Sequence, residues 1–297
     1  MSLVIKNLPC SNSSITYFVE WASSISQQLS AAGWTQTADT GQVNWSTISS
    51  VPGSNTYVYE IWQPNDGLTN FYFKIEYGSS YWSSVPALRL SVSDSTTGTG
   101  VLNGNVTSLF ETVCQNNMPT STLPLPCYFS YENGRFNCML WSGITAETVF
   151  GIERSRTTSG TYTGNYITLL CAGFYQNQSQ QSLWMGVGVP PYQGAYGYTV
   201  GYSQNNGFWN ARFPFVILPD TINVLYDNQI MVDFVAPCVG YFDVPVTMFG
   251  FTSAFNTANM QQVSSINGHQ YLVLNMGYSG LSGAYSIEDV SFVMRID

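Results

Sequence analysis

The chain has 297 residues, of which 8% are charged and 15% are aromatic, and its formal net charge is −9. Because about a quarter of the residues in an average soluble protein are charged, the sequence predicts an unusually neutral, polar surface. It contains only two lysines, Lys6 and Lys74, and no basic run, which argues against nucleic-acid binding. Such a surface suits a protein packed against other subunits or a secreted protein.

The N-terminal segment MSLVIKNLPCSNSS lacks the apolar core of a secretion signal. No apolar run reaches the roughly 18 residues that a membrane span needs, so we expect a soluble chain that is not exported. The cysteines show neither C-x-x-C nor disulfide-framework spacing, which predicts free thiols in a reducing cytoplasm. These residues are Cys10, Cys114, Cys127, Cys138, Cys171 and Cys238.

The first predicted element is an amphipathic helix over residues 13 to 32. Apolar residues recur there at spacings of three and four, at Ile15, Phe18, Val19, Ala22, Ile25 and Leu29. Asn12 or Ser13 can cap its start, and Gly33 can end it. A neutral polar surface is expected from Ser23, Ser24, Gln27, Gln28 and Ser30. The helix is therefore expected to lie along a sheet with one face exposed.

After the helix the chain reads as short strands separated by turn residues. Strands are expected near residues 56–62, 70–78, 87–93, 148–155, 182–189, 223–236, 246–255, 270–277 and 289–296. Alternation in 70–78 places Phe71, Phe73 and Ile75 on one face, which is typical of a half-buried antiparallel strand. We predict a mainly β protein, an antiparallel β-sandwich or jelly roll with one N-terminal helix. Two units are expected, residues 1–171 and 172–297.

A β-hairpin is predicted at residues 127–141, CYFSYENGRFNCMLW, because Asn-Gly favours a type I′ turn. In that register Glu132 faces Arg135 and Phe129 faces Cys138. Cys127 and Cys138 then point into the core as diagonal neighbours, roughly 7–8 Å apart, too far for an unstrained disulfide. Glu132 and Arg135 are expected to form an exposed ion pair. We interpret this hairpin as a packing element and not as a site of chemistry.

Residues for catalysis are sparse in this sequence. His269 is the single histidine, and there is no Walker loop, H-E-x-x-H, G-x-S-x-G or G-x-G-x-x-G motif. A pair of carboxylates could hydrolyse glycosides, but the candidates have no distinguishing context; they are Glu60, Asp66, Glu76, Asp227 and Asp233. No residue is therefore assigned a catalytic, cofactor-binding or metal-binding role.

The 8 tryptophans and 20 tyrosines leave two interpretations open. Exposed rings could form stacking platforms for sugars, as in lectins. Alternatively, the rings fill the core and subunit interfaces, where aromatic residues are enriched and lysine and glutamate are depleted.

Four segments resemble structural proteins of tailed-bacteriophage virions. They are LSAAGWTQTADTGQVNWSTISSVP (29–52), YEIWQPNDGL (59–68), FKIEYGSS (73–80) and FGIERSRTTSGTYTG (150–164). In such proteins an amphipathic N-terminal helix precedes a β-rich body, and a Gly-rich loop like that at 93–104 recurs. The resemblance covers pieces of roughly the first 165 residues and brings no active-site residues with it.

The leading functional hypothesis is a non-enzymatic virion component of the tail, neck or capsid surface, assembled in the host cytoplasm. Its expected partners are copies of itself, as a trimer or a larger lattice, and other virion proteins. The alternatives are a lectin-like module that binds a host-surface glycan and a carboxylate-pair glycosidase. Neither a cofactor nor a nucleic-acid partner is expected.

Overall fold

The computed structural model describes residues 2–8, 15–68, 70–79, 86–104, 106–108, 112–113, 125–132, 135–141, 146–156, 162–175, 180–188, 202–203, 207–208, 224–226, 229–234, 246–253, 261–266, 269–275 and 290–295. Most side chains in these ranges are described as far as residue 152, and beyond it the description is of the backbone.

Helix α1 spans Ile15–Ala31, close to the predicted range of 13 to 32. The core of the predicted apolar stripe is fully buried, at Phe18, Ala22, Ile25 and Leu29. The helix is followed by Gly33 with φ of +86°, a left-handed conformation that glycine adopts without a steric penalty. The proposed capping residues Asn12 and Ser13 lie outside the described residues.

The buried face of α1 is wider than the predicted stripe. Ser24 was expected on the polar surface but is fully buried, as is Trp21, which the stripe did not include. The Ser24 hydroxyl donates a hydrogen bond to the carbonyl oxygen of Glu20, one turn earlier. A hydroxyl satisfied by its own helix backbone can be buried without an external partner, so the assignment of Ser24 to the exposed face was wrong.

One 12-stranded antiparallel sheet contains the strands between residues 2 and 188 other than the short strands at residues 95–96 and 102–103. Its order is β1-β10-β11-β12-β13-β9-β5-β4-β3-β2, with β14 paired to β13 and β8 paired to β5. The strands are β1 (Ser2–Leu8), β2 (Trp34–Gln36), β3 (Tyr57–Pro64), β4 (Tyr72–Ser79), β5 (Pro86–Ser93), β8 (Thr107–Ser108), β9 (Thr112–Val113), β10 (Leu125–Glu132), β11 (Arg135–Trp141), β12 (Ala146–Arg156), β13 (Tyr162–Tyr175) and β14 (Gln180–Gly188). Because β9 pairs with both β5 and β13, it joins two halves of the sheet.

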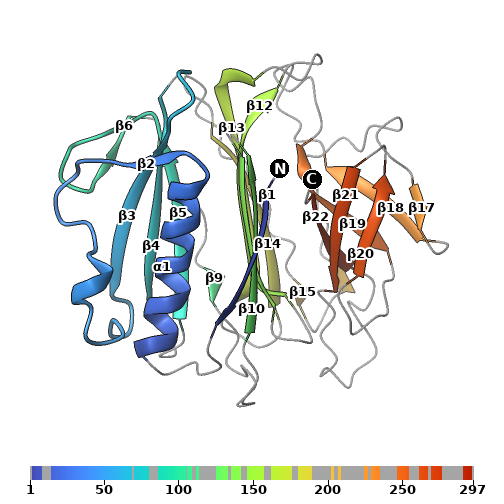
Figure 1. The fold of residues 1–297 in the computed structure, drawn as a ribbon, viewed down its shortest axis with the longest axis horizontal. Coiled ribbons are helices and arrows are strands. Elements are labelled where there is room, and N and C mark those ends of the chain that lie inside the picture. The colour runs from blue at the N-terminus through green and yellow to red at the C-terminus, as the bar shows by residue number, and fades with distance from the viewer. Residues whose placement is uncertain are drawn as a thin grey trace.

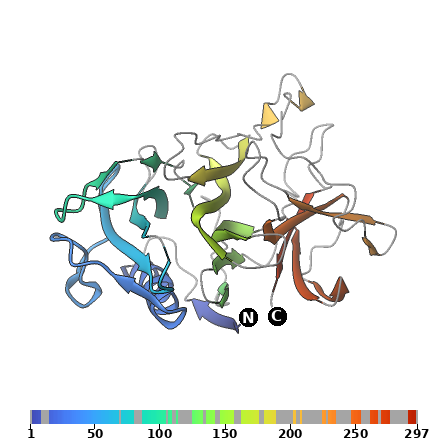
Figure 2. The ribbon, with the colours of Figure 1, turned by 90° about the horizontal axis from the view of Figure 1, so that it is seen from above.

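These two halves enclose a shared core. Figures 1 and 2 show β3–β5 and β10–β12 as two walls, with α1 at one side of the space between them. The rings of Phe73 on β4 and Phe150 on β12 have centroids 6.2 Å apart, and a single hydrophobic cluster includes α1 and both halves. Since α1 contacts both β1 and β2, the two end strands of the sheet, the helix fills the region between its ends.

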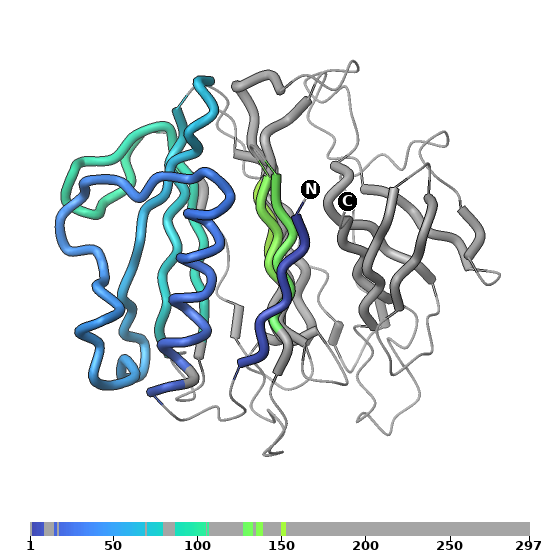
Figure 3. Tube along the Cα trace, viewed as in Figure 1, coloured from blue at the N-terminus to red at the C-terminus, as the bar shows by residue number. Residues whose placement is uncertain are grey.

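Strand β4 alternates as the sequence predicts. Along β4, Phe73, Ile75 and Tyr77 are buried in the core, whereas Tyr72, Lys74 and Glu76 are partly exposed on the other face. The trace in Figure 3 shows α1 in front of β4 and β5, so the helix covers the apolar face of this part of the sheet.

Strands β10 and β11 pair in the predicted register, with Phe129 opposite Cys138 and Glu132 opposite Arg135. Their Asn133-Gly134 connection lies outside the described residues. The prediction of an exposed ion pair was wrong, because Arg135 is fully buried while Glu132 is 31% exposed. The polar face of this hairpin is covered, since Tyr128, Ser130 and Asn137 are buried as well. The hairpin lies inside the sheet, between β1 and β12, and both of its faces are packed.

A second antiparallel sheet has six strands in the order β17-β18-β19-β22-β21-β20. They are β17 (Val224–Tyr226), β18 (Gln229–Phe234), β19 (Val246–Ser253), β20 (Gln261–Ile266), β21 (His269–Asn275) and β22 (Val290–Arg295). The expected single strand at 223–236 is therefore a hairpin of β17 and β18. Two short pairs complete the described strands: β6 (Ser95–Thr96) with β7 (Leu102–Asn103), and β15 (Tyr202–Ser203) with β16 (Gly207–Phe208).

The described part of the chain is mainly β, with antiparallel sheets and one α-helix, which confirms the predicted fold class. The finer expectation of a sandwich or jelly roll stays a prediction. The same holds for the division into residues 1–171 and 172–297, although residue 171 lies within β13, which pairs with β14.

Candidate functional site

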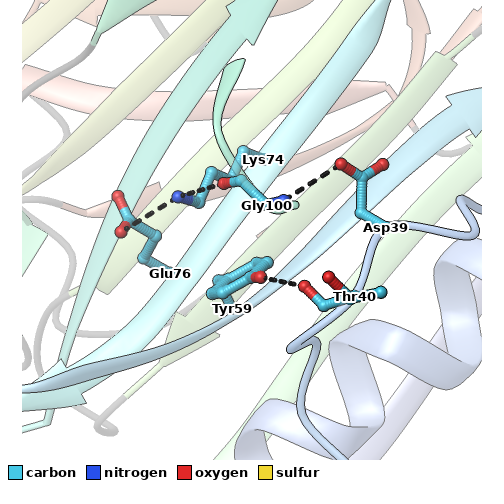
Figure 4. Close-up of polar contacts among 6 residues, drawn as sticks. All are labelled: Asp39, Thr40, Tyr59, Lys74, Glu76 and Gly100. Atoms are coloured by element: carbon cyan, nitrogen blue, oxygen red, sulfur yellow. Dashed lines mark hydrogen bonds and ion pairs between the residues drawn. The ribbon is translucent and has the colours of Figure 1, made fainter. Parts of the chain in front are cut away.

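A polar cluster on the outer face of β3 and β4 is drawn in Figure 4. We call it the Asp39 cluster; its members are Asp39, Thr40, Tyr59, Lys74, Glu76 and Gly100. The Asp39 carboxylate accepts hydrogen bonds from the Thr37 hydroxyl at 2.7 Å, from the Gly100 N–H at 3.1 Å and from the Thr96 hydroxyl. These contacts tie the segment after β2 to the β6–β7 hairpin.

Tyr59 and Lys74 extend this cluster onto the sheet. The Tyr59 hydroxyl donates to the Thr40 carbonyl oxygen at 2.6 Å, and Lys74 Nζ donates to the Gly100 carbonyl oxygen at 3.0 Å. The Lys74 ammonium also lies 3.5 Å from a Glu76 carboxylate oxygen and 4.5 Å from the centroid of the Tyr59 ring. Tyr59 and Lys74 therefore hold two loops on the sheet, the segment after β2 and the β6–β7 connection.

Protonation in the Asp39 cluster follows from these contacts. Burial by itself raises the pKa of Asp39, but hydrogen bonds from Thr96, Thr37 and the backbone outweigh that effect and hold the pKa below its ordinary value. Burial, together with the negative charge of Asp39, raises the pKa of Tyr59. At neutral pH the cluster thus contains an ionised carboxylate and a neutral phenol.

A second polar cluster lies on the opposite, helix-covered face of the sheet. We call it the Glu60 cluster. Glu60 Oε1 accepts hydrogen bonds from Ser26 Oγ and Trp45 Nε1, each at 2.8 Å, and its Oε2 accepts from Trp62 Nε1 and Tyr77 Oη, each at 3.2 Å. The Glu60 residue is 1% exposed. Burial raises the pKa of Glu60 more than the four hydrogen bonds lower it, and burial with the adjacent Glu60 raises the pKa of Tyr77.

Aromatic rings enclose the Glu60 cluster. Trp45, in the 3₁₀ helix η1 (Trp45–Thr47), packs edge-on against Tyr77 and Phe18, with ring centroids 5.1 and 6.1 Å apart. The ring centroids of Trp21 and Tyr77 are 6.1 Å apart. This carboxylate therefore joins α1, η1, β3 and β4 from inside the core, where a substrate has no access.

The structure describes the side chains of three of the five candidate carboxylates, Glu60, Asp66 and Glu76. Glu60 points to the core and Glu76 to the outer face, because they pair with Ile75 and Tyr59 respectively in the β3–β4 register. Asp66 accepts a hydrogen bond from the Leu68 N–H at 3.1 Å, within its own turn. The side chains of Asp227, Asp233 and His269 lie outside the described residues.

Cys127 and Cys138 are buried on the apolar face of the hairpin, as predicted, and no disulfide joins them. Their Sγ atoms are 3.8 Å apart. The other cysteine side chains lie outside the described residues, so six free thiols stay a prediction. The described residues contain no cluster of histidine, cysteine or carboxylate side chains suited to a metal ion.

The tryptophans whose side chains are described lie in the core. Trp21, Trp34 and Trp62 are buried, and Trp45 is half-buried against the same hydrophobic cluster. None of these rings presents an open face of the kind that stacks on a sugar. Trp82, Trp141, Trp184 and Trp209 lie outside the described side chains.

No charged residue whose burial is described belongs to the fully exposed class. Every charged residue whose burial is described is either buried or only partly exposed: Lys6, Glu20, Asp39, Glu60, Asp66, Lys74, Glu76, Arg89, Asp94, Glu132 and Arg135. Arg89 illustrates the pattern, because its guanidinium carbon lies 3.8 Å from the centroid of the Tyr57 ring. In most folded proteins charged residues are the most exposed class, so this surface is unusual.

Local sequence patterns do not single out Asp39, Tyr59 or Lys74 as members of a site. The turn-like segment TADTG (37–41) is a signal for a hydrogen-bonded turn around Asp39. Its partners Thr96 and Gly100, however, lie 57 and 61 positions away in sequence, and no local pattern links such distant residues.

Comparison with known proteins gives no family assignment: no family model and no curated protein matches this chain. Within the part of the chain that the structure describes, no helix is long and apolar enough to cross a membrane.

Proposed function

We propose that this protein is a non-enzymatic structural component of a tailed-phage virion, in the tail, the neck or the capsid surface. It acts by self-assembly and by contacts with other virion proteins. The proposal combines the sequence resemblance of residues 29–52, 59–68, 73–80 and 150–164 with the properties of the described surface.

The observation that carries the proposal is that no charged residue of described burial is fully exposed. Lysine and the acidic residues are depleted at the centre of protein–protein interfaces, because charged groups lose hydration when a partner covers them. Neutral polar side chains lose less on burial. A subunit that buries much of its surface in a particle is expected to have this composition.

The two alternatives receive less support from the described residues. A glycan-binding module would display aromatic rings at the surface, whereas the described tryptophans belong to the core. A carboxylate-pair glycosidase would bring two carboxylates about 5–9.5 Å apart around a substrate, whereas Glu60 and Glu76 point to opposite faces of the sheet.

Particle composition tests the proposed function directly. Phage particles would be purified from infections with the intact gene and with a nonsense mutation in it, and both would be examined by peptide mass spectrometry and electron microscopy. We expect the chain at a constant copy number in intact particles, and particles lacking a tail, neck or surface feature with the mutant gene. Complete, infectious particles without the chain would overturn the proposal.

A further inference from the structure

Among the described strands, β1 is an end strand of the first sheet. It pairs with β10 along its whole length, from Ser2 opposite Tyr131 to Leu8 opposite Leu125, and it is the terminal strand in the sheet order. Among the described residues, no strand and no backbone hydrogen bond occupies its other edge. The outward N–H and C=O groups of such an edge are a template for another strand.

The side chains of β1 separate into a covered and an exposed set. Leu8 is fully buried and Val4 packs against the hydrophobic cluster. On the opposite face, Leu3 is 37% and Ile5 is 54% exposed. Two neighbouring exposed aliphatic side chains on an open strand combine backbone hydrogen-bonding capacity with apolar surface.

Strand β1 lacks several of the devices that protect an edge strand, although α1 contacts it. The strand contains no proline, and its register with β10 runs without a bulge. Lys6 is its single charged residue and is only partly exposed. The opposite end of the sheet differs, because β2 has only three residues, and very short edge strands are a common protection against pairing.

The geometry points to a two-fold contact in which β1 of one copy pairs antiparallel with β1 of a second copy. In this register Leu3 lies opposite Ile5 of the other copy, Val4 opposite Val4, and Ser2 opposite Lys6. This contact rests on the proposed function and names one surface through which the subunit assembles. It extends the sheet from one copy into the next.

A second copy fits this edge because β1 is self-complementary in that register. The two-fold axis produces the pair of Leu3 with Ile5 of the other copy twice. Each Lys6 lies opposite Ser2 of the other copy, so no like charges are directly opposed. A shift by two residues that places Leu3 opposite Asn7 would leave Ile5 opposite Ile5 as the one pair between the exposed apolar residues. Because a two-fold contact joins only two copies, a trimer would require another surface as well.

Paired substitutions test both the edge and the register. Leu3→Lys with Ile5→Lys places like charges opposite each other across the contact, whereas Leu3→Lys with Ile5→Glu places opposite charges there. Sedimentation velocity over a concentration series would measure self-association of the full chain. We expect the first double variant to weaken the β1-dependent step about tenfold or more, and the second to restore it to within about threefold of the parent.

Val101→Lys is the matched control, because Val101 is 57% exposed and lies outside β1. It should leave self-association unchanged. Melting temperatures would identify a folding defect, and the single variant Ile5→Lys replaces any double variant that fails to fold. Equal self-association of the parent and the Lys/Lys variant would overturn the inference, and equal weakening by both double variants would overturn the register.

The outcomes separate this inference from the proposed function. A parent protein that stays monomeric at every concentration excludes the β1 contact, while particle composition decides the virion role independently. If the chain is present in particles and the Lys/Lys variant assembles normally, the proposed function stands and the β1 contact fails.

Discussion

Two carboxylates, Glu60 and Asp39, have pKa values displaced in opposite directions. Glu60 is enclosed by aromatic rings, so the loss of hydration dominates and raises its pKa. Asp39 accepts hydrogen bonds from hydroxyl groups and from backbone N–H groups, which together lower its pKa despite burial. The balance between desolvation and hydrogen bonding therefore differs between two acids that serve the same purpose, the attachment of loops and helix to one sheet.

Glu60→Gln is expected to destabilise the fold by about 1–3 kcal/mol, because the new amide cannot accept the hydrogen bonds now made to both carboxylate oxygens and leaves a buried donor such as Trp62 Nε1 unsatisfied. Urea unfolding at neutral pH measures the change. Glu76→Gln is the matched control on the partly exposed outer face, with an expected loss below about 1 kcal/mol. Equal losses would show that the Glu60 cluster contributes nothing specific.

Asp39→Asn tests the lowered pKa through the pH dependence of stability. A carboxyl whose folded pKa lies below its unfolded value contributes stability that is present above the unfolded value and is lost as pH falls through the folded one. The stability difference between parent and variant should therefore shrink as pH falls below about 4. The pKa of Glu60 is shifted in the opposite direction. Its contribution to stability is therefore lost as pH rises from its ordinary pKa through the raised one. A parent–variant difference that stays constant with pH would contradict the assignment for Asp39.

At the scale of elements, α1 is the part that holds the two ends of the first sheet together. Phe18 is fully buried and packs against Trp21 and Trp45, with ring centroids 6.3 and 6.1 Å away. Phe18→Ala should cost about 3–5 kcal/mol, a large part of the roughly 5–15 kcal/mol that stabilises a domain. Thermal unfolding should show a sharply lower melting temperature or no folded protein.

Gln27→Ala is the control for that helix, since Gln27 is exposed and alanine favours helix. Its melting temperature should match that of the parent. If Phe18→Ala also melts like the parent, α1 is a detachable arm whose apolar face is reserved for another subunit.

The β6–β7 hairpin depends on Gly100 for its close approach to the sheet. Gly100 has φ of +81°, and a Cβ atom there would clash with Tyr59 Oη; Gly98 has φ of +79° with open space at the same position. Gly98→Ala should therefore cost only the backbone strain, about 1–2 kcal/mol. Gly100→Ala should cost about 1 kcal/mol more, because Tyr59 must move and lose its hydrogen bond to Thr40. Equal losses in urea unfolding would contradict this account of the loop.

At the scale of the whole molecule, the neutral surface predicts assembly. Light scattering of the purified chain at micromolar concentration should give a mass above the 32.8 kDa of one copy. A multiple of two is expected from the β1 contact, a multiple of three from the trimer expected on sequence grounds, and six copies from both contacts together. A stable monomer without partners would contradict self-assembly in solution.

Local patterns in the sequence were sufficient for the helix, for most strands and for the register of β10 with β11. The apolar spacing that predicts α1 and the alternation along β4 are properties of neighbouring residues, and the Asn133-Gly134 pair predicts the hairpin register from the turn alone. For the same reason the fold class, mainly β with one helix, follows from the amino-acid sequence by itself. Strands β1, β13 and β20 were not predicted, nor were the strands of two or three residues β2, β6, β7, β8, β9, β15 and β16.

Tertiary structure alone decided which faces are covered and which strand ends the sheet. Arg135 reads as a surface residue beside a turn but is fully buried, and Ser24 reads as polar surface but faces the core. Glu60 receives hydrogen bonds from Ser26 and Trp45, at sequence separations of 34 and 15. Burial and hydrogen bonding at such positions depend on which distant elements pack together, whereas periodicity records only the immediate neighbourhood of each residue.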